Sequence, residues 1–416
     1  MESSTMMSLN NKKILLGISG GIAAYKSPEL VRQLIKQGAQ VQVVMTDAAT
    51  QFVTPTTMQA VSGNPVFLSQ WDTRIANGMP HIELTRDVDA ILIAPASADF
   101  MAKLSLGLAN DLLSTLCLAK GHESQGEIAP CPLLITPAMN RQMWEHVATQ
   151  RSVQRLLQDQ VTILGPASGD QACGEVGMGR MLEPIEICES VIAFFQPKLL
   201  QGKKVLITAG PTFEEIDPVR GITNRSSGKM GFAIARAAVE AGAEVQLISG
   251  SVHLDTPLAF LGKTKRIYVQ SATEMHAAVM SQSHCDVFFS VAAVADWRVS
   301  QVASQKMKKQ SASDTLTLEL VQNPDILLDF ATSPVGQSAF CIGFAAESEN
   351  ILEYGKKKLI AKKIPLLIAN HGPSTFGEDI NQVTLIDSHG ELSLGPSDKL
   401  ALARDIIFQV AHRLLK

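Results

Sequence analysis

The feature that most constrains the fold is a pattern that occurs twice along the chain. The first copy opens with KKILLGISGG at residues 12–21, continues through a helical stretch and ends in QGAQVQVVMT at residues 37–46. The second copy opens with KKVLITAGPT at residues 203–212 and ends in AGAEVQLISG at residues 241–250. Apolar run, glycine loop, helix, glycine and second apolar run form the pattern of a right-handed βαβ unit with parallel strands.

Further apolar runs follow in each half. The first half has DAILIAP and CPLLITP, and the second has CDVFFSVAAV, AFCIGFAA and IPLLIAN. Strands that alternate with helical segments are typical of doubly wound α/β domains, so we predict two parallel-sheet, Rossmann-like domains. Pro197 should end one helix, and Gly202 precedes the second βαβ unit, so we place the domains at residues 1–197 and 198–416.

Composition narrows the class of protein. With 46% hydrophobic and 18% charged residues, the 416-residue chain can fill two cores. A formal net charge of -4 and the absence of any run of 18 apolar residues give no reason to expect nucleic-acid or membrane partners. The opening MESSTMMSLNNKK lacks the apolar core of a signal peptide, and the six cysteines form no C-x-x-C pair. We therefore expect a cytoplasmic protein without disulfides or a zinc site.

The first glycine loop, GISGGIAAYK, lacks the G-x-G-x-x-G fingerprint of dinucleotide-binding folds. The second strand ends at Thr46 rather than at an acidic residue that could bind a ribose hydroxyl, which disfavours NAD. Ser19, Gly20 and the start of the following helix could instead hold a single phosphate. A tight turn between strand and helix explains the same glycines equally well.

The second glycine loop, NRSSGKMG, is only superficially similar to a P-loop. Gly221 and Gly228 are too far apart for Walker A spacing, and Met230 stands where that motif needs a hydroxyl residue. Two hydroxyls, a glycine and a lysine at a predicted helix start still favour phosphate binding. The alternative is that Ser226 or Ser227 only caps the helix.

Ligands of an open parallel sheet bind beyond the carboxyl ends of its strands. Apart from Met139, the residues expected there in the first domain are small or polar, namely Ser19, Gly20, Gly21, Thr46, Ser97 and Asn140. This rim suits a flat aromatic cofactor with a phosphate tail, and it carries neither paired carboxylates nor a serine–histidine order. A lone histidine such as His81 is more often structural, and Asn140 could equally form a turn after Pro137.

The segment GDQACGEVGMGRM, residues 169–181, contains four glycines and Cys173. Because glycine loses the most backbone entropy on folding, we predict a mobile loop here rather than part of a packed core. Most of the other cysteines lie in apolar stretches and should be small buried hydrophobic residues. Taken alone, Cys173 is most simply an incidental loop cysteine.

Motifs of both halves, taken together, resemble known enzyme families. SGGIAAYK, HIEL, APASAD, LANDLLST, PAMN and QACGEVGMGRM occur in that order and resemble the flavin-containing cysteine decarboxylases. The second half, with TAGPT, DPVR, TNRSSGKMG, AAVADW, KMKK, NPDIL and GFAAE, resembles the phosphopantothenate–cysteine ligases. The two sets in this order, over roughly residues 10–412, are similar to the bacterial bifunctional decarboxylase/ligase enzymes of coenzyme A biosynthesis.

For the first half, the resemblance implies a decarboxylase of 4'-phosphopantothenoylcysteine that yields 4'-phosphopantetheine. Its catalytic residues would be His81, Asn140, which binds the substrate, and Cys173, the proton donor on a glycine-hinged flap. In such enzymes FMN oxidises the cysteinyl thiol to a thioaldehyde, the electrons left by departing carbon dioxide flow into it, and reduced flavin returns the hydride. FMN would lie against Ser19, Gly20, Gly21, Thr46, Ser97 and Met139.

The family builds these decarboxylase sites where subunits meet. The resemblance therefore implies a homo-oligomer of trimer-based symmetry, such as a dodecamer.

For the second half, the resemblance implies ligation of cysteine to 4'-phosphopantothenate with CTP. The pantothenate carboxylate would attack the α-phosphorus to form an acyl-cytidylate and pyrophosphate, and the amine of cysteine would then displace CMP. Asn224 and Lys306 would be catalytic, with Lys306 balancing charge as the transition state forms. The nucleotide-binding positions would be Ala292, Ala293, Asp296, Lys306, Pro324, Asp325, Ile326, Leu327, Phe344, Lys358 and Lys362.

The assignment of two lysines to the ligase site has a simple alternative. Lys358 and Lys362 lie four residues apart, on one helical face, and in isolation they would be a solvated basic surface. Mg²⁺ is expected to accompany the phosphates of CTP, with water and phosphate oxygens as its main ligands, and no protein metal site is predicted.

The chain departs from the family pattern at two places. Residues 120–132 form a longer connection than usual, which we expect to extend a surface loop, and Gln305 stands where the family commonly has glutamate. Two other functions fit part of the pattern: a binding module of this fold without catalysis, and a flavin enzyme for another cysteine-ended substrate, such as a peptide. The joint presence of His81, Asn140 and Cys173 disfavours the first, and the ligase-like half disfavours the second.

Overall fold

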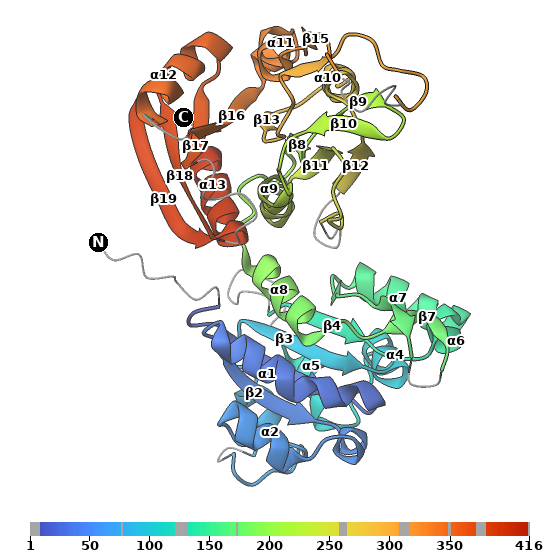
Figure 1. The fold of residues 1–416 in the computed structure, drawn as a ribbon. Helices are drawn as coiled ribbons and strands as arrows, with labels where there is room; N and C mark the ends of the chain where they lie inside the picture. Colours follow the sequence, from blue (N-terminus) through green and yellow to red (C-terminus); the bar gives the residue numbers. More distant parts are fainter. Residues whose placement is uncertain are drawn as a thin grey trace. The chain divides into compact units, whose positions relative to one another are not determined.

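The structure is a computed structural model of the chain. It describes residues 9–75, 78–120, 131–171, 174–257, 264–307, 316–347, 351–371 and 380–414. The chain divides into two compact units between Phe195 and Gln196, two residues before the boundary predicted from the sequence (Figure 1). The ten residues 121–130, most of the long connection noted above, lie outside the described ranges.

The N-terminal unit is built on a five-stranded sheet with the order β2-β1-β3-β4-β5, and all neighbouring strands run parallel. Its strands are β1 (Lys13–Ile18), β2 (Gln40–Met45), β3 (Ala90–Ala96), β4 (Leu133–Pro137) and β5 (Thr162–Ile163). Its helices are η1 (Ile22–Lys26), α1 (Ser27–Lys36), η2 (Asp47–Gln51), α2 (Pro55–Ser62), α3 (Pro80–Glu83), α4 (Ala98–Leu106), α5 (Leu112–Ala119), α6 (Arg141–Glu145), α7 (Val147–Gln158) and α8 (Pro184–Phe195). An antiparallel hairpin, β6 (Ala167–Asp170) with β7 (Val176–Arg180), follows the sheet.

The C-terminal unit is built on an eight-stranded sheet with the order β12-β11-β8-β13-β16-β17-β18-β19. Six strands are parallel: β8 (Lys204–Ala209), β11 (Glu244–Ser249), β12 (Thr264–Tyr268), β13 (Val287–Ser290), β16 (Phe340–Glu347) and β17 (Leu366–His371). The last two, β18 (Ile380–Asp387) and β19 (Gly390–Asp398), are antiparallel additions that the sequence analysis did not predict.

Helices and two small antiparallel strand pairs complete the C-terminal unit. One pair is the hairpin of β9 (Phe213–Asp217) and β10 (Arg220–Thr223), and the other joins β14 (Trp297–Val299) to β15 (Leu320–Gln322). The helices are α9 (Lys229–Glu240), α10 (Ala272–Met280), α11 (Ile326–Thr332), η3 (Gly336–Ser338), α12 (Ile351–Lys362) and α13 (Lys399–Leu414). The predicted fold class, two doubly wound α/β domains, is confirmed.

Both sheets are covered on two faces, which explains why central strands such as β3 and β13 are apolar along their length. Successive strand residues point to opposite faces, so alternate side chains enter different cores. In the C-terminal unit, Val205 and Ile207 pack with α9 and α13, whereas Leu206 and Phe288 pack with α10 and α11. In the N-terminal unit, Leu15 belongs to the core formed with α4, α5 and α7.

The two units also resemble each other in how an aspartate binds the start of their first strand. In the N-terminal unit, Asp89 precedes β3 and accepts hydrogen bonds from the Lys13 amide at 2.8 Å and the Lys12 ammonium at 2.9 Å. Burial alone raises the pKa of the Asp89 carboxyl, but these two lysines outweigh it, so the pKa lies below its ordinary value.

The C-terminal unit repeats this arrangement, which we call the Lys–Lys–Asp brace. Asp286 precedes β13 and accepts from the Lys204 amide at 2.8 Å and the Lys203 ammonium at 3.3 Å. Its pKa is also lowered, because the lysine contacts outweigh the effect of burial. In both units the brace therefore ties the first strand of the sheet to its neighbour.

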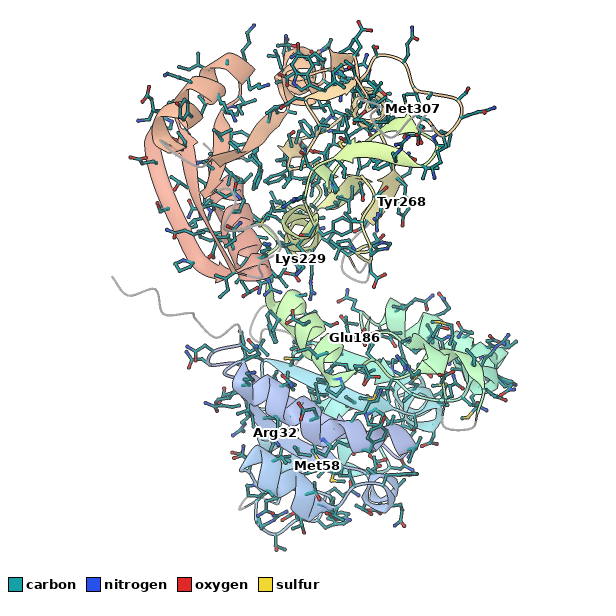
Figure 2. The ribbon with its side chains drawn as sticks, viewed as in Figure 1. Arg32, Met58, Glu186, Lys229, Tyr268 and Met307 are labelled. Atoms are coloured by element: carbon teal, nitrogen blue, oxygen red, sulfur yellow. The ribbon has the colours of Figure 1, made fainter. Side chains whose placement is uncertain are left out.

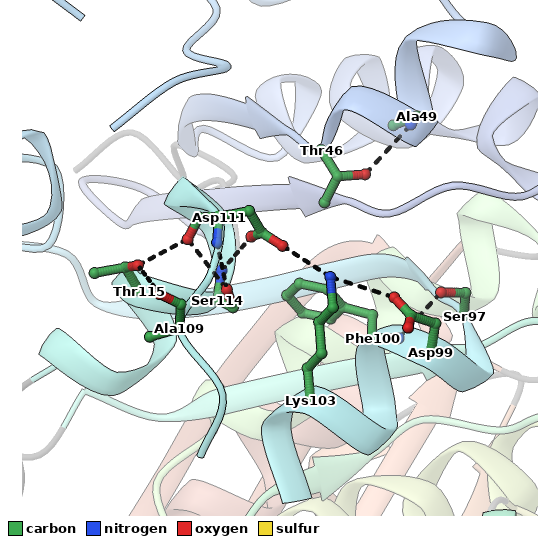
Figure 3. A network of polar contacts seen from close by, with 10 residues as sticks. All are labelled: Thr46, Ala49, Ser97, Asp99, Phe100, Lys103, Ala109, Asp111, Ser114 and Thr115. Carbon is green, nitrogen blue, oxygen red and sulfur yellow. Dashed lines mark hydrogen bonds and ion pairs between the residues drawn. The ribbon is translucent and has the colours of Figure 1, made fainter. Parts of the chain in front are cut away.

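A second polar network stabilises the ends of two helices in the N-terminal unit. Asp111 caps α5 and forms a capping box with Ser114, whose amide donates to the carboxylate at 2.8 Å. Lys103 of α4 lies 3.2 Å from the Asp111 carboxylate and 3.4 Å from that of Asp99 (Figure 3). This network holds α4 and α5 together and gives Asp111 a structural role.

The two braces predict a pH-dependent contribution to stability. Because the folded pKa of each aspartate lies below the unfolded value of about 3.9, the contribution is complete above that value and is lost as the pH falls through the folded pKa. We expect Asp89→Asn and Asp286→Asn each to lower the free energy of unfolding by about 1 kcal/mol at pH 7. The difference from wild type should shrink at pH 3. Chemical unfolding followed by circular dichroism measures both, and an equal loss at the two pH values would contradict the ionic origin.

Candidate functional site

A cavity of about 470 Å³ opens at the carboxyl ends of β1, β3 and β4 in the N-terminal unit. This volume lies within the range of about 300–1,000 Å³ that is usual for small-molecule sites. Five of the predicted site residues line it: Gly20, Gly21, Ser97, Met139 and Asn140. The cavity therefore occupies the sheet edge at which the sequence predicts a ligand.

Ser19 lies behind this cavity rather than in its lining. Its side chain is fully buried, donates to the Pro95 carbonyl at 2.9 Å and accepts from the Ser97 amide at 2.9 Å. The hydroxyl thus joins the ends of β1 and β3, and this hydrogen bonding fixes the backbone on which the adjacent glycines stand.

Gly20 and Gly21 lack side chains for different reasons. A Cβ on Gly20 would lie 2.5 Å from the Cβ of Ala48, so close packing inside the protein requires glycine there. Gly21 has an extended φ of 164°, which any residue can adopt, and an added Cβ would meet no atom within 4 Å. Nothing within the described protein explains the glycine at position 21, but a ligand that approaches the backbone would.

Two polar residues of the cavity also cap helices. Ser97 accepts from the Phe100 amide at 3.2 Å at the start of α4, and Asn140 accepts from the Met143 amide at 3.0 Å at the start of α6. The Asn140 amide nitrogen donates to the Gln142 side chain at 3.0 Å. These contacts fix the rotamer of Asn140 while its side chain lines the cavity.

Most of the glycine-rich segment belongs to the strands of the β6–β7 hairpin, so the prediction of a mobile loop in place of regular structure is wrong for those strands. A Cβ on Gly179 would lie 2.5 Å from the Met139 carbonyl, and one on Gly177 would lie 2.5 Å from Cδ of Arg141. The Met139 amide donates to the Gly179 carbonyl at 3.0 Å. These two glycines therefore permit close packing of the hairpin. Ala172 and Cys173, which stand between β6 and β7 in the sequence, lie outside the described residues.

Two predicted residues of this site are placed elsewhere. Thr46 follows β2 and accepts from the Ala49 amide at 3.3 Å, which caps η2. His81 lies in the short helix α3 and its carbonyl accepts from the Thr85 hydroxyl at 2.8 Å. Neither side chain lines the cavity of its own chain.

The sequence analysis missed the charged part of this cavity. Lys26 is 7% exposed, and its ammonium donates to the Met181 carbonyl at 3.1 Å and to Glu183 at 2.8 Å. Arg180 also lines the cavity, and its Nε is buried without a hydrogen-bond partner. The lysine of SGGIAAYK and the arginine of GMGRM were visible in the motifs, but only the fold shows that they share one cavity.

The C-terminal unit has a smaller cavity, of about 230 Å³, at the start of α9. Ser226, Ser227, Gly228 and Lys229 line it, and Figure 2 shows Lys229 at the end of that helix. The N-cap of α9 is Gly228, with φ 76° and no side-chain cap, so the alternative that a serine of this loop caps the helix is wrong. A helix N-terminus with hydroxyls and an ammonium is suited to an anion.

Three predicted residues, Ala292, Ala293 and Phe344, line this second cavity. Asn224 approaches it from β10, because its side-chain amide donates to the Ala293 carbonyl at 3.0 Å. Asn370, Asn381 and Lys399 also line it and were not predicted.

The remaining predicted ligase residues do not line this cavity: Asp296, Lys306, Pro324, Asp325, Ile326, Leu327, Lys358 and Lys362. Asp325 caps α11 through the Leu328 amide at 3.1 Å and forms an ion pair with Lys362 of α12. This contact joins two of the predicted positions directly.

The five cysteines that the structure describes are all free and buried. Burial raises the pKa of Cys188, Cys285 and Cys341 to about 12, and it raises that of Cys117 as well. Since the thiolate is the reactive form, these thiols remain unreactive near neutral pH. The prediction that they are small buried hydrophobic residues is consistent with this environment.

Within the described residues, no group of three or more His, Cys, Asp and Glu side chains is arranged to hold a metal ion. None of the described helices has both the length and the apolar character needed to cross a bilayer.

Comparison with known proteins gives two family matches that together span the chain. The Flavoprotein family model matches residues 2–196, and the model for the DNA/pantothenate metabolism flavoprotein C-terminal domain matches residues 200–414. The coenzyme A biosynthesis bifunctional protein CoaBC of Vibrio cholerae serotype O1 is 49% identical over 98% of this chain and 100% of its own length.

Two solved structures resemble single parts of the chain. The C-terminal domain of a coenzyme A biosynthesis bifunctional protein CoaBC is 39% identical, with a TM-score of 0.44, and covers 52% of this chain and 98% of its own. A PPC decarboxylase mutant complexed with pantothenoylaminoethenethiol is 30% identical, with a TM-score of 0.39, and covers 44% of this chain and 98% of its own.

The two glycines predict separable effects on folding and ligand binding. We expect Gly20→Ala to destabilise the protein by about 1–3 kcal/mol, because the new methyl group overlaps Ala48. Gly21→Ala should fold as wild type but lose flavin affinity by roughly tenfold or more, since only a ligand would meet its methyl group. Thermal unfolding of the flavin-free protein and fluorescence titration with FMN measure the two effects. Wild-type flavin affinity in Gly21→Ala would refute the assignment of this cavity.

Proposed function

The chain belongs to the family of CoaBC bifunctional proteins of coenzyme A biosynthesis, and from this premise we propose how its two units divide the chemistry. The protein is a bifunctional enzyme with a flavoprotein decarboxylase half and a ligase half. The N-terminal unit would decarboxylate 4'-phosphopantothenoylcysteine to 4'-phosphopantetheine. The C-terminal unit would form that substrate from 4'-phosphopantothenate, cysteine and CTP. The observation that carries the decarboxylase assignment is the N-terminal cavity. Its lining brings together Gly20 and Gly21 of the first glycine loop, Gly179 of the β6–β7 hairpin and Asn140.

FMN fits the N-terminal cavity on the chemistry of its lining. Gly21 leaves backbone open to a ligand, and Ser97, at the start of α4, offers a hydroxyl. When bound, FMN would supply the two-electron redox chemistry that decarboxylation of a saturated thiol requires. The residues of this chain would bind it, orient the substrate and exclude water.

We assign substrate binding to Asn140 and proton donation to Cys173. The Asn140 side chain is held by Met143 and Gln142, so a donor for a carboxylate would be preorganised at the cavity wall. Cys173 would lie on the β6–β7 hairpin and return a proton to the product carbon. The hairpin packs on Met139 and Arg141 through Gly177 and Gly179, which supports its role as the cover of this cavity.

We propose that the decarboxylase site is completed by a second copy of the chain, in a trimer-based homo-oligomer. Ile22 and Tyr25 line the cavity yet are 58% and 63% exposed in the single chain, an unusual place for large apolar side chains. Thr46 and His81 lie outside the cavity of their own chain, so they would act at the cavity of a neighbouring copy.

In the ligase half, we assign catalysis to Asn224 and Lys306 and phosphate binding to the start of α9. The pantothenate carboxylate would attack the α-phosphorus of CTP and release pyrophosphate. The amine of cysteine would then attack the acyl carbon, CMP would leave, and the amine would lose a proton. Lys306 would balance the added negative charge on the phosphorus centre.

The C-terminal cavity, at about 230 Å³, is small for a nucleoside triphosphate. CTP would therefore extend beyond it toward Asp296, the start of α11 and Lys358, the predicted positions outside its lining. Mg²⁺ would be held chiefly by phosphate oxygens and water, with at most isolated carboxylates of the described chain. We place the enzyme in the cytosol, in keeping with its free, buried thiols.

The division of labour predicts reciprocal losses of activity. Asn224→Asp replaces the amide that donates to the Ala293 carbonyl with a carboxylate, so ligation should fall by roughly 100-fold or more. Decarboxylation of supplied phosphopantothenoylcysteine should be unchanged. Cys173→Ser should leave ligation unchanged, but the decarboxylated, oxidised enethiol should accumulate in place of 4'-phosphopantetheine because the proton donor is missing. Mass detection of CMP and of the thiol products separates the two reactions, and loss of both in either variant would mean that the units do not act independently.

The shared site predicts that assembly and flavin binding are linked. Tyr25→Glu places a charge on the proposed contact, so it should lower the oligomeric mass and reduce flavin content together. Trp71→Glu is the control, because Trp71 is 79% exposed but does not line the cavity. Sedimentation with simultaneous detection at a flavin wavelength measures both. A Tyr25→Glu protein that dissociates yet keeps full flavin affinity would show that one chain suffices.

A further inference from the structure

Asp217, at the end of β9, is a buried carboxylate outside both cavities. Its Oδ1 accepts from the amides of Val219 and Arg220, both at 2.9 Å, in the turn between β9 and β10. Its Oδ2 accepts from the Arg220 guanidinium, with Nε at 3.0 Å, and from the Met307 amide at 3.1 Å. One carboxylate therefore joins a hairpin turn to a segment 90 residues later in the chain.

That segment carries Lys306 and is held from both sides. The Arg220 guanidinium donates to the Met307 carbonyl at 2.9 Å, immediately after Lys306. Before it, the Ala303 amide donates to the Ile216 carbonyl of β9 at 3.0 Å. Figure 2 shows Met307 beside the β9–β10 hairpin. Lys306 is thus an exposed side chain on a backbone that is fixed against this hairpin.

The other end of the hairpin leads to Asn224. Thr223, the last residue of β10, pairs with Phe213, and its hydroxyl donates to the Thr212 carbonyl at 2.7 Å. The next residue, Asn224, donates to the Ala293 carbonyl at 3.0 Å. The base of the β9–β10 hairpin is therefore attached at the C-terminal cavity, while its tip binds residues 303–307, the segment that carries Lys306.

The β9–β10 hairpin also has a buried contact with helix α10. Glu214 of β9 is 3% exposed and accepts from the Ala272 amide at the start of α10 at 2.9 Å. A two-stranded hairpin is only marginally stable by itself. These contacts at the base, the middle and the tip therefore fix its conformation, and with it the distance between Asn224 and the segment that carries Lys306.

We propose that Asp217 is a positioning residue for ligation: by holding the Met307 backbone, it fixes the place of Lys306 relative to Asn224. The inference rests on the proposed catalytic roles of those two residues and adds the device that sets their separation. Hydrogen bonding from Arg220 lowers the pKa of the Asp217 carboxyl well below its ordinary value, so the clamp remains ionised at neutral pH.

The chemistry of the clamp makes Asp217→Asn a selective test. The Asn carbonyl can still accept from the two turn amides, Val219 and Arg220, which preserves the turn. Its NH₂ group then faces the guanidinium and the Met307 amide, all of which are donors. The substitution therefore removes the link to the lysine segment while it preserves the local shape.

We expect Asp217→Asn to lower kcat for ligation by roughly 10–100-fold, because a displaced charge no longer meets the transition state. The KM for phosphopantothenate should change by less than about threefold, since Lys306 is assigned to the nucleotide and the transition state and not to ground-state binding of phosphopantothenate. In a Lys306→Gln background, measured in single turnovers, Asp217→Asn should add less than about threefold, because the two act as one unit. Trypsin should also cleave after Lys306 faster in Asp217→Asn than in wild type.

Asp387→Asn is the matched control in the same unit. Asp387 accepts from the His389 amide at 2.8 Å and the Arg413 guanidinium at 2.9 Å, the same chemistry remote from the predicted site residues. It should reduce thermal stability yet leave ligation kcat and cleavage after Lys306 unchanged.

Two outcomes would overturn the proposal: a wild-type kcat in Asp217→Asn, or the same loss in both backgrounds. Full ligation by Lys306→Gln would instead refute the proposed role of Lys306. In that case the cleavage assay still decides whether Asp217 holds the segment, because an unchanged rate overturns the clamp and a faster rate supports it.

Discussion

Parallel pairing of the first strand with both neighbours is the constraint on which the rest of this structure depends. In each unit the first strand lies inside the sheet, flanked on one side by the strand after the first helix and on the other by a later strand, β3 or β13. Since parallel strands place their carboxyl ends at one edge, the loops that follow them are brought together regardless of their separation in sequence. Both cavities lie at such an edge, and the helices on the two faces leave it open.

The fold could be predicted from the sequence because the repeated βαβ pattern is local. Each copy is specified within a short stretch of sequence, residues 12–46 in the first and residues 203–250 in the second, so periodicity and glycine positions suffice. The strands β18 and β19 were missed for the opposite reason. β18 pairs antiparallel with β17, and β19 pairs antiparallel with β18. The residues of β18 largely alternate between buried and more exposed, and no residue of β19 is buried, so neither strand forms the apolar run of a covered strand. The β6–β7 hairpin was misinterpreted because an entropic argument ignores contacts: Gly179 is required by the Met139 carbonyl pressed against it.

The site residues that the sequence placed correctly are mainly those that directly follow strands at the edge of the sheet. Gly20, Gly21, Ser97, Met139 and Asn140 directly follow strands, so topology alone places them near one another. Lys26 and Glu183 are 157 residues apart, and no sequence spacing indicates that they form an ion pair. Asn381, in β18, and Lys399, which directly follows β19, line the C-terminal cavity. They were missed because neither strand was predicted. Thr46 and His81 show a further limit, because neither lines the cavity of its own chain and contacts within one chain therefore do not explain their predicted roles.

The Lys–Lys–Asp brace has a consequence for how the two halves of such a chain could be separated or joined in evolution. Each unit contains all three members of its own brace, and the division between Phe195 and Gln196 separates none of them from its partners. The ends of both sheets are therefore secured by residues that the same half encodes. A gene fission at this point would yield two polypeptides with intact first strands, and a gene fusion would require only a short linker rather than a rebuilt interior.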